Sequence, residues 1–290
     1  MTGSILSIQS HVAYGYVGNR AAAFPLQRLG REVIAVNTVQ FSNHTGYGAW
    51  RGDVAAPLHV REVLSGVEER GGFDACDAAL SGYLGDAALG EAVLAAVTAL
   101  KRRRPQAVYC CDPVMGDVGR GFFVRPGVPE FMRDQAVPAA DIVTPNHFEL
   151  EALTGAAVHT LDDALAATAA LRALGPSVVL VTSLARRGGA ENEIEMLADG
   201  PAGAFLIAAP RLPFDTPPNG GGDLTAALFL AHWLGRRDAA AALEATAAAV
   251  HQVFAETARR GGRELQIVAA QDAYVSAARP FVARRLTPAL

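Results

Sequence analysis

The amino-acid sequence predicts an α/β fold, a three-layer α/β/α sandwich with a mainly parallel central sheet. Two observations predict it. Short apolar or β-branched runs alternate with longer helical patterns, which is typical of βαβ units around a parallel sheet. Turn-forming residues separate the two kinds of segment, for example Pro145-Asn146 and the stretch 175–177. With 290 residues, 51% of them hydrophobic, and no linker or repeat, the chain is expected to form one domain over 1–290.

The expected strands are short, and many of them end in polar residues. The clearer strands span 4–9, 33–38, 78–81, 107–112, 141–144 and 178–182, and two weaker ones span 194–197 and 204–208. Helical patterns cover 19–29, 60–70, 89–103, 149–153 and 162–174, and a helix-rich third follows Asp223 as far as Ala258. Part of the N-terminal half is expected to form a small flap or an edge of the sheet.

Charge and composition exclude several classes of protein. The chain has 25 Lys and Arg residues against 29 Asp and Glu residues, and its net charge of −4 argues against non-specific binding of nucleic acid. Lys101 is the one lysine of the sequence, and it lies in a run of cations, 101–104, at the expected end of a helix. Walker-A nucleotide hydrolases, protein kinases with a strand lysine and Schiff-base enzymes are disfavoured, because each depends on a lysine in its site.

The sequence shows no signal for secretion or for a membrane. Its first residues lack a cationic segment followed by a long apolar run, and no stretch approaches the ~18 apolar residues of a membrane span. Cys76, Cys110 and Cys111 form neither a disulfide framework nor a pattern with zinc-site spacing. The chain is therefore expected to be a cytoplasmic protein.

Polar residues gather repeatedly where the expected strands end. In an open parallel sheet, ligands bind beyond the carboxyl ends of the strands. The polar clusters lie at 9–11, 37–47, 81–83, 112–113, 144–146 and 182–183. Any one of them is compatible with ordinary turn chemistry, but together they favour a ligand-binding crevice.

The most informative motif is Asn219-Gly220-Gly221-Gly222-Asp223, which precedes an apolar helical run. The glycines free the backbone to turn, so that N–H groups at the start of a helix can point at an anion. An ionised aspartate at this junction can accept a proton from an approaching hydroxyl group. Together they provide a base and a cradle for a transferring phosphoryl group without a lysine. A plain helix N-cap at Asp223 explains the pentapeptide alone equally well.

Two further carboxylates and a glycine-rich segment belong to the expected site. Asp112 ends an apolar run, and Glu149 follows Asn146 at the start of a helix. Carboxylates near nucleotide phosphates could hold Mg²⁺, although a glutamate in the first turn of a helix also suits the helix dipole. The stretch 116–127 contains four glycines and has the composition of a lid that excludes water; a plain surface loop is the alternative.

Imidazole and aromatic side chains are weaker candidates. His11, His44 and Tyr83 could form hydrogen bonds with a flat heterocycle or stack on it. The other histidines show no partner pattern and are expected to be structural or exposed: His59, His147, His159, His232 and His251. Acyl transfer is poorly supported, because the sequence has no Gly-x-Ser-x-Gly elbow and no cysteine with a histidine partner.

Motifs along nearly the whole chain resemble, in order, those of pyridoxal kinases. They lie at 8–12, 15–22, 37–47, 81–83, 111–117, 141–146, 220–227 and 264–268. The glycine–aspartate motif alone indicates only the wider ribokinase-like superfamily. The octapeptide QFSNHTGY at 40–47 is far more specific and indicates a vitamin B6 ring as the ligand.

The resemblance implies a role for individual residues in a phosphoryl transfer. Asp223 would take the proton from the 5′-hydroxymethyl group of pyridoxal, and the amides of Gly220, Gly221 and Gly222 would form the anion hole for the γ-phosphoryl group of ATP. The pyridine ring and its substituents would contact Ser10, His44, Thr45, Gly46 and Tyr83. The nucleotide would contact Asp112, Thr144, Asn146, Glu149, Thr182, Ser183, Phe214, Asn219 and Gly220.

Cofactors and partners follow from the same resemblance. Mg²⁺ would be held with Glu149 and Asp117, and a monovalent cation, K⁺, with Asp112, Thr144 and Thr182. The protein would be a homodimer that acts on pyridoxal, and also on pyridoxine and pyridoxamine, with no nucleic-acid or membrane partner. Hydroxymethylpyrimidine or another small alcohol is the alternative substrate, and a non-catalytic B6-binding protein is the alternative function.

The chain departs from parts of the family pattern. Thr182 stands where many bacterial members carry a lysine, and the cysteine found in the lid of some relatives is absent. The stretch 210–218, which contains four prolines, aligns poorly. These departures affect the lid and the adenine side of the nucleotide site, and they leave the residues for phosphoryl transfer in place.

Overall fold

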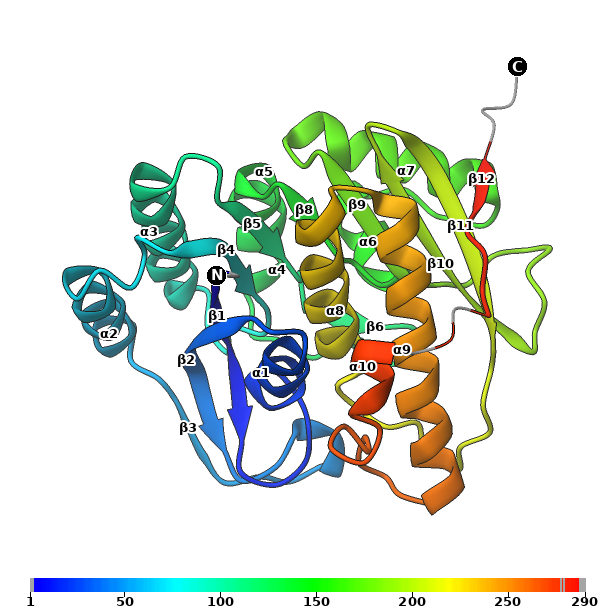
Figure 1. Ribbon diagram of the computed structural model, residues 1–290, viewed down its shortest axis with the longest axis horizontal. Helices are drawn as coiled ribbons and strands as arrows, with labels where there is room; N and C mark the ends of the chain where they lie inside the picture. Colours follow the sequence, from blue (N-terminus) through cyan, green and yellow to red (C-terminus); the bar gives the residue numbers. More distant parts are fainter. Residues whose placement is uncertain (1–2, 277, 279, 287–290) are drawn as a thin grey trace.

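The computed structural model describes residues 3–276, 278 and 280–286, and its centre is a ten-stranded sheet (Figure 1). The middle of the sheet is parallel and contains, in spatial order, β9 (Val178–Leu184), β8 (Ile142–Val143), β5 (Val108–Cys111), β4 (Cys76–Ser81), β1 (Ser4–Val12) and β2 (Glu32–Phe41). Antiparallel strands extend both edges: β10 (Glu193–Gly200), β11 (Gly203–Pro210) and β12 (Arg284–Leu286) beyond β9, and β3 (Gly52–Val54) beyond β2. The predicted mainly parallel sheet is confirmed.

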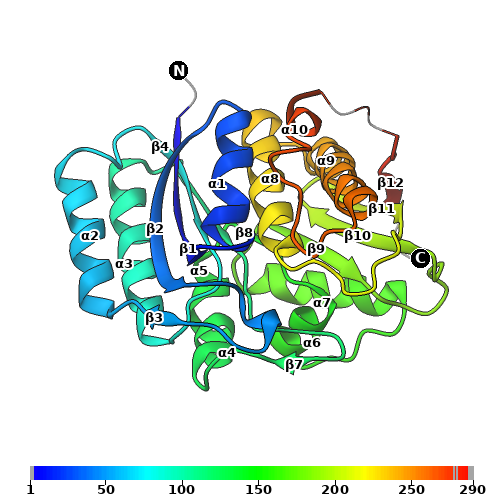
Figure 2. The ribbon, with the colours of Figure 1, turned by 90° about the horizontal axis from the view of Figure 1, so that it is seen from below.

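Helices cover both faces of this sheet, as Figures 1 and 2 show. One face packs against α1 (Asn19–Arg28), α8 (Gly221–Arg236), α9 (Ala239–Arg260) and α10 (Asp272–Ser276). The other packs against α2 (Pro57–Glu69), α3 (Ala88–Arg103), α6 (His147–Thr154), α7 (Leu161–Leu174) and the segment of α4 (Val128–Phe131), η2 (Met132–Ala136) and α5 (Val137–Ala139). The neighbours Cys110 and Cys111 point into opposite layers because side chains alternate along a strand. The predicted three-layer α/β/α sandwich is therefore confirmed.

The helices begin where the sequence supplies capping groups. Asn146 caps α6 and Thr160 caps α7, and in each case the third residue of the helix, Glu149 or Asp163, accepts a hydrogen bond from the backbone of the cap in return. The Asp238 side chain accepts from two backbone amides at the start of α9. Among the described residues, no helix combines the length and the apolar character needed to cross a bilayer.

All eight predicted strands and all five predicted helices are present, with ends shifted by a few residues. The predicted helix-rich third forms α8 and α9, with α10 after them. Several short elements were missed: β3, β12, the hairpin of β6 (Gly116–Asp117) and β7 (Gly121–Phe122), and the helical segment 128–139. Strands of two or three residues carry no usable periodicity, and Pro129 and Pro138 hide the helical segment from a pattern search.

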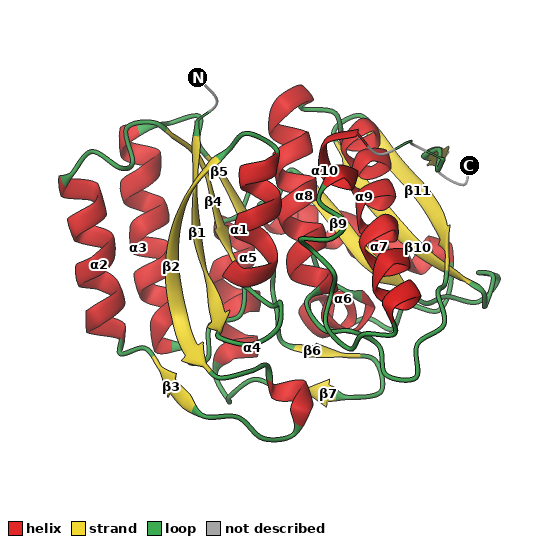
Figure 3. Ribbon diagram, turned by 60° about the horizontal axis from the view of Figure 1, so that its bottom comes forward, coloured by secondary structure: helices red, strands yellow, loops and turns green. Residues whose placement is uncertain are grey.

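The carboxyl ends of the parallel strands meet at one end of the sheet. There, the short helix η1 (Thr45–Tyr47) and β3 follow β2, and the hairpin β6–β7 follows β5. Figures 2 and 3 show β3 and β7 at this same end, below the tips of β1 and β2. The fold therefore places the polar clusters predicted from the sequence around one region.

Candidate active site

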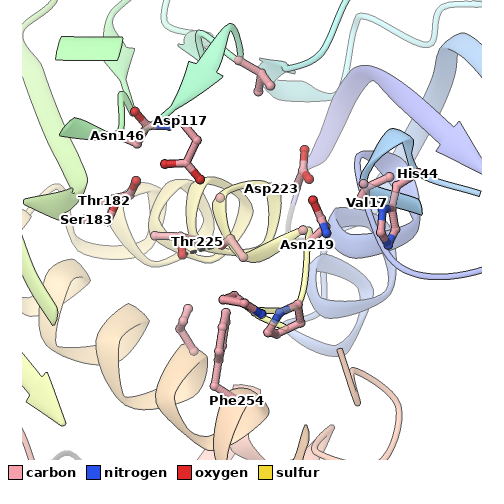
Figure 4. Close-up of a pocket in the computed structure, with 18 of the residues that line it drawn as sticks. Val17, His44, Asp117, Asn146, Thr182, Ser183, Asn219, Asp223, Thr225 and Phe254 are labelled. Atoms are coloured by element: carbon pink, nitrogen blue, oxygen red, sulfur yellow. Dashed lines mark hydrogen bonds between the residues drawn. The ribbon is translucent and has the colours of Figure 1, made fainter. Parts of the chain in front are cut away.

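A cleft of about 1020 Å³ lies beyond these strand ends. Its lining includes every residue that the sequence placed in a substrate, nucleotide or metal site: Ser10, His44, Thr45, Gly46, Tyr83, Asp112, Asp117, Thr144, Asn146, Glu149, Thr182, Ser183, Phe214, Asn219, Gly220, Gly221, Gly222 and Asp223. Figure 4 shows part of this lining, with Asp223 between Asn219 on one side and Asp117 and Asn146 on the other. Residues that are far apart in the sequence thus share one cavity.

Asp223 lies in the first turn of α8, which begins at Gly221 with Gly220 as its N-cap. The N-cap explanation of Asp223 is therefore wrong. Gly220 has φ 90°, and a Cβ atom there would lie 1.9 Å from the carbonyl oxygen of Tyr16, so the turn requires glycine. Burial raises the pKa of Asp223 to about 6, although the backbone amides of Gly18 and of Asp223 itself oppose the rise. A carboxyl with this pKa is suited to act as a base near neutral pH.

The glycines next to Asp223 bring the backbone to the cleft. Gly222 is exposed, and a Cβ atom built on it would meet no other atom within 4 Å. The amides at the start of α8 have no helical partner, and the helix dipole adds positive potential at the same place. This arrangement can bind an anionic group beside the Asp223 carboxyl.

Asp112 is a buried carboxyl with one free oxygen. Its Oδ1 accepts a hydrogen bond from Thr144 Oγ1 over 2.9 Å, and its Oδ2 has no partner among the described residues. Burial raises the pKa of Asp112 well above its ordinary value, and the negative charges of Glu149 and Asp223 add to the rise. An orphaned carboxylate oxygen in this setting fits a bound cation, which would offset the cost of burying the charge.

Glu149 is held by the backbone around it. Its Oε1 accepts from the amide of Met115 over 2.9 Å, and its Oε2 accepts from the amide of Asn146 over 2.9 Å. Burial raises the pKa of Glu149 to about 8, against the effect of these amides. The first-turn role considered from the sequence is thus present, and the same side chain lines the cleft. Asp117 is exposed on the lid, and no group of three or more metal-ligating His, Cys, Asp or Glu side chains occurs in the described part of the chain.

The glycine-rich stretch 116–127 begins with the hairpin β6–β7 and lies over the cleft. Asn146 Nδ2 donates to the carbonyl oxygen of Gly116 over 2.8 Å, which ties the start of the hairpin to α6. Arg120 Nη1 lies 3.4 Å from Asn219 Oδ1 and so connects the hairpin to the glycine turn. The lid hypothesis remains a proposal, and Arg120 is a cleft residue that the sequence did not single out.

The apolar end of the cleft lies between β10, β11 and α9. Ile194, Met196 and Leu212 line it, together with the rings of Phe214 and Phe254, whose centroids are 5.9 Å apart. This is the shape and chemistry of a site for a flat heterocycle. Phe254 had no sequence signal, because it is one apolar residue on a largely apolar helix.

Three histidines behave differently from one another here. His44 lines the cleft, whereas His11, which was also a candidate for contact with the heterocycle, is not among the lining residues. His251 was expected to be structural or exposed, but it lines the cleft from α9. Its ring also packs edge-on against Phe281, with centroids 5.1 Å apart.

Comparison with known proteins gives consistent results. The family model described as "Phosphomethylpyrimidine kinase" matches residues 72–267. A relative from Rubrobacter xylanophilus, "Pyridoxal kinase PdxY", is 60% identical over 98% of this chain and 97% of the relative, and one of the same name from Leifsonia xyli is 51% identical over 97% and 99%. A solved structure, "Pyridoxal Kinase from Leishmania donovani in complex with ADP and Pyridoxine", has a TM-score of 0.90 and 29% identity, and the match covers 98% of this chain and 99% of that one.

The fold, the cleft and these similarities agree along almost the full length of the chain. The parallel sheet ends at a cavity that contains a base, an anion-binding turn and an apolar slot. The relatives at 60% and 51% identity carry the same printed name. The chain therefore belongs to the pyridoxal kinase family, with the ribokinase-like α/β fold.

Proposed function

We propose that this protein transfers the γ-phosphoryl group of ATP to the 5′-hydroxymethyl group of pyridoxal, and that it also accepts pyridoxine and pyridoxamine. The observation that carries the proposal is the position of Asp223 in the first turn of α8, beside the free amides of the glycine turn and inside the common cleft. The printed names of the relatives and the ADP and pyridoxine of the Leishmania donovani complex support it.

Asp223 acts as the general base in this proposal. Its carboxylate accepts the hydroxyl proton as the substrate oxygen attacks the phosphorus atom in line with the leaving group. The amides of Gly220, Gly221 and Gly222 stabilise the negative charge on the transferring phosphoryl oxygens. The protein supplies position and electrostatic stabilisation, which are the main requirements of phosphoryl transfer.

The two ligands occupy opposite ends of the cleft. The B6 ring lies at the end formed by Ser10, His44, Thr45, Gly46 and Tyr83, and the apolar residues Val17, Val39 and Phe41 line the same end. Adenine lies in the slot formed by Phe214, Phe254 and their apolar neighbours. The phosphates then extend past Thr144, Asn146, Thr182, Ser183 and Asn219 toward Asp223.

Cations fit beside the proposed phosphate path. A monovalent cation, K⁺, would be held by Asp112, Thr144 and Thr182, where the unpartnered Oδ2 of Asp112 is available. Mg²⁺ would be held near Asp117 and Glu149, through water at Glu149 because backbone amides already occupy its oxygens. When bound, the metal ions neutralise charge on the phosphates.

The lid stretch 116–127 excludes water from the reacting groups in this proposal. Arginines line the described cleft at 120, 211 and 263. Arg211 donates to the carbonyl oxygens of Glu191 and Glu193, and Arg263 donates to that of Gly46. Arg120, which contacts Asn219 next to the glycine turn, is the one placed to approach the transferring phosphoryl group when the lid closes.

A second candidate substrate is hydroxymethylpyrimidine, because the family model that matches residues 72–267 is described as that of a phosphomethylpyrimidine kinase. The ratio of kcat/KM values for pyridoxal and for hydroxymethylpyrimidine decides between the two. A higher value for pyridoxal supports the proposed function, and a higher value for the pyrimidine overturns it. Pyridoxal binding without turnover in the presence of Mg-ATP would instead support a non-catalytic B6-binding protein.

We further propose that the chain works as one domain and as a homodimer in the cytoplasm. One sheet that extends from β12 to β3 supports a single domain, and family membership supports the dimer. The buried free thiols of Cys76, Cys110 and Cys111 are compatible with a reducing compartment. Light scattering coupled to size-exclusion chromatography tests the dimer, which a monomer mass at assay concentration would contradict.

A further inference from the structure

The segment that follows α9 meets the loop that follows β2 at the ring end of the cleft. Arg263 Nη2 donates to the carbonyl oxygen of Gly46, and the Arg263 guanidinium lies 4.1 Å from the centroid of the Tyr47 ring. Glu264 contacts both His44 and Tyr47 of the same loop. Residues about two hundred positions apart in the sequence therefore hold the loop that carries the proposed ring contacts.

Glu264 is the centre of this contact. Its Oε1 lies 2.9 Å from His44 Nε2 and accepts from the Tyr47 hydroxyl over 2.7 Å, while its Oε2 accepts from the amide of Tyr16 over 3.1 Å. The side chain of His44 is 4% exposed and that of Glu264 is 12% exposed. Burial raises the pKa of Glu264, but the hydrogen bonds from His44 and Tyr47 outweigh it and leave the pKa below its ordinary value.

The Glu264 carboxylate decides how His44 can act. A carboxylate only accepts hydrogen bonds, so His44 Nε2 must carry a proton toward it. In a neutral imidazole the other nitrogen, Nδ1, then has a free lone pair. His44 Nδ1 is buried and has no partner among the described residues, and it lies 3.0 Å from the position that a Cβ atom on Gly46 would occupy. His44 and Gly46 both line the cleft (Figure 4).

We infer that Glu264 is a positioning residue, which fixes His44 with the proton on Nε2 and presents Nδ1 as the acceptor for a hydrogen-bond donor on the substrate ring. The inference rests on the proposed function for the identity of that ring. Glu264 does not touch the substrate, and it acts through the orientation and tautomer of His44. The shared hydrogen bond from Tyr47 and the clamp by Arg263 on Gly46 keep the loop in the same place.

Glu264→Gln separates this role from simple anchoring of the loop. An amide has the size of the carboxylate, but it has one acceptor oxygen and one donor NH₂ group, whereas the protein offers three donors at this place. If the NH₂ group faces His44, Nε2 must accept and the proton moves to Nδ1, so that the ring nitrogen facing the substrate becomes a donor. The polarity of the His44 contact is then reversed while the packing is kept.

The kinetic test compares Glu264→Gln with the wild type and with a matched control, Glu244→Gln. Glu244 Oε1 also accepts a backbone hydrogen bond, from Ala283 over 3.0 Å, but Glu244 does not line the cleft. We expect Glu264→Gln to raise KM for pyridoxal about 10- to 100-fold, the size expected for a lost hydrogen bond to a polar partner. The KM for ATP should stay unchanged, and the control should match the wild type. Equal KM values for pyridoxal in Glu264→Gln and wild type would overturn the inference.

The tautomer can also be measured directly, without turnover. Nitrogen-15 NMR of the imidazole side chains, with the His44 signals assigned by their loss in His44→Gln, should show a protonated Nε2 and an unprotonated Nδ1 in the wild type. Protonation of Nδ1 with an unprotonated Nε2 would overturn the inference whether or not the variants fold. A protein with the expected tautomer but without activity on any B6 vitamer would contradict the proposed function instead, so the two failures are distinguishable.

Discussion

Thr144 and Asp112 are joined by a buried hydrogen bond at the carboxyl ends of β8 and β5. Thr144 Oγ1 donates to Asp112 Oδ1 over 2.9 Å, which leaves Asp112 Oδ2 without a partner in the described part of the chain. The hydrogen bond fixes the direction of the carboxyl group. A charge that is buried in this way is stable only with a compensating cation or a bound proton.

The first prediction concerns this cation. Replacing tetramethylammonium chloride by KCl at constant ionic strength should raise the Tm, because a ligand that binds only the folded state stabilises it, by about 2.7 kcal/mol at one hundred times its Kd. The tetramethylammonium ion is too large and has no place for protein oxygens. Asp112→Asn should lose the response, and Asp215→Asn, on the exposed loop 211–217, should retain it. The same Tm for the wild type in both salts would rule out a cation at Asp112.

The second prediction concerns the pH dependence of turnover. Burial raises the pKa of Asp223 to about 6, and the base must be ionised to accept the hydroxyl proton. The value of kcat/KM for pyridoxal should therefore fall about tenfold per pH unit below that pKa and level off above it. A profile of kcat/KM between pH 4.5 and 8, corrected for the ionisation of the substrate, checks this. A flat profile through pH 6 would show that Asp223 is not the titrating base.

The third prediction is the stability counterpart of the raised pKa. A carboxyl whose pKa is higher in the folded than in the unfolded protein stabilises the fold while it is protonated, and this contribution is lost as the pH rises through the folded pKa. Asp223→Asn, which stays neutral, should therefore have a higher Tm than the wild type at pH 8, and the difference should shrink at pH 4. A lower Tm of the variant at pH 8 is the contrary result.

The fourth prediction concerns Arg120 in the lid. Loss of a charge-assisted contact with the phosphoryl group should lower kcat of Arg120→Ala by about 10- to 100-fold, with little change in the stability of the fold. Arg125→Ala is the matched control, because Arg125 is a second exposed lid arginine whose Nη1 pairs with Asp86 over 2.9 Å. Steady-state kinetics of both variants tests the assignment. Equal kcat values in the two would remove Arg120 from the transfer step.

The fifth prediction concerns the turn before α8. Gly220→Ala forces a Cβ atom to within 1.9 Å of the carbonyl oxygen of Tyr16 at φ 90°. The free energy of unfolding should fall by at least about 2 kcal/mol, in line with a strained backbone and a steric clash. Gly222→Ala is the control, since nothing lies within 4 Å of its Cβ position. Urea denaturation compares them, and similar midpoints would contradict the described turn.

Much of this fold and cleft was predictable because the signals are local or follow from sheet topology. The alternating strands and helices gave the parallel sheet, and parallel strands bring their carboxyl ends to one edge. Ser10, Asp112, Thr144 and Thr182 therefore meet although they are spread over more than half of the sequence. The glycine turn before Asp223 was visible for the same reason, as a backbone requirement written in glycine.

Other parts of the site were not predictable, because they depend on contacts that no local pattern encodes. The hydrogen bond between Glu264 and His44 joins a turn after α9 to a loop after β2, and nothing in either segment identifies the other. Arg120 and His251 enter the cleft through the course of the hairpin β6–β7 and of α9. The position of Asp223 inside the first turn, and not at the N-cap, depended on where the helix begins, and such boundaries are set by the whole fold.

The central claim is that Asp223 takes the substrate proton, and the most direct measurement is the phosphoryl-transfer rate of Asp223→Asn. Asparagine keeps the size of the side chain and removes the base. With saturating pyridoxal and Mg-ATP, and pyridoxal 5′-phosphate followed by absorbance, kcat should fall by at least about 10²- to 10⁴-fold, while calorimetry should find pyridoxal binding close to that of the wild type. A kcat near that of the wild type would contradict the assignment of Asp223 as the general base.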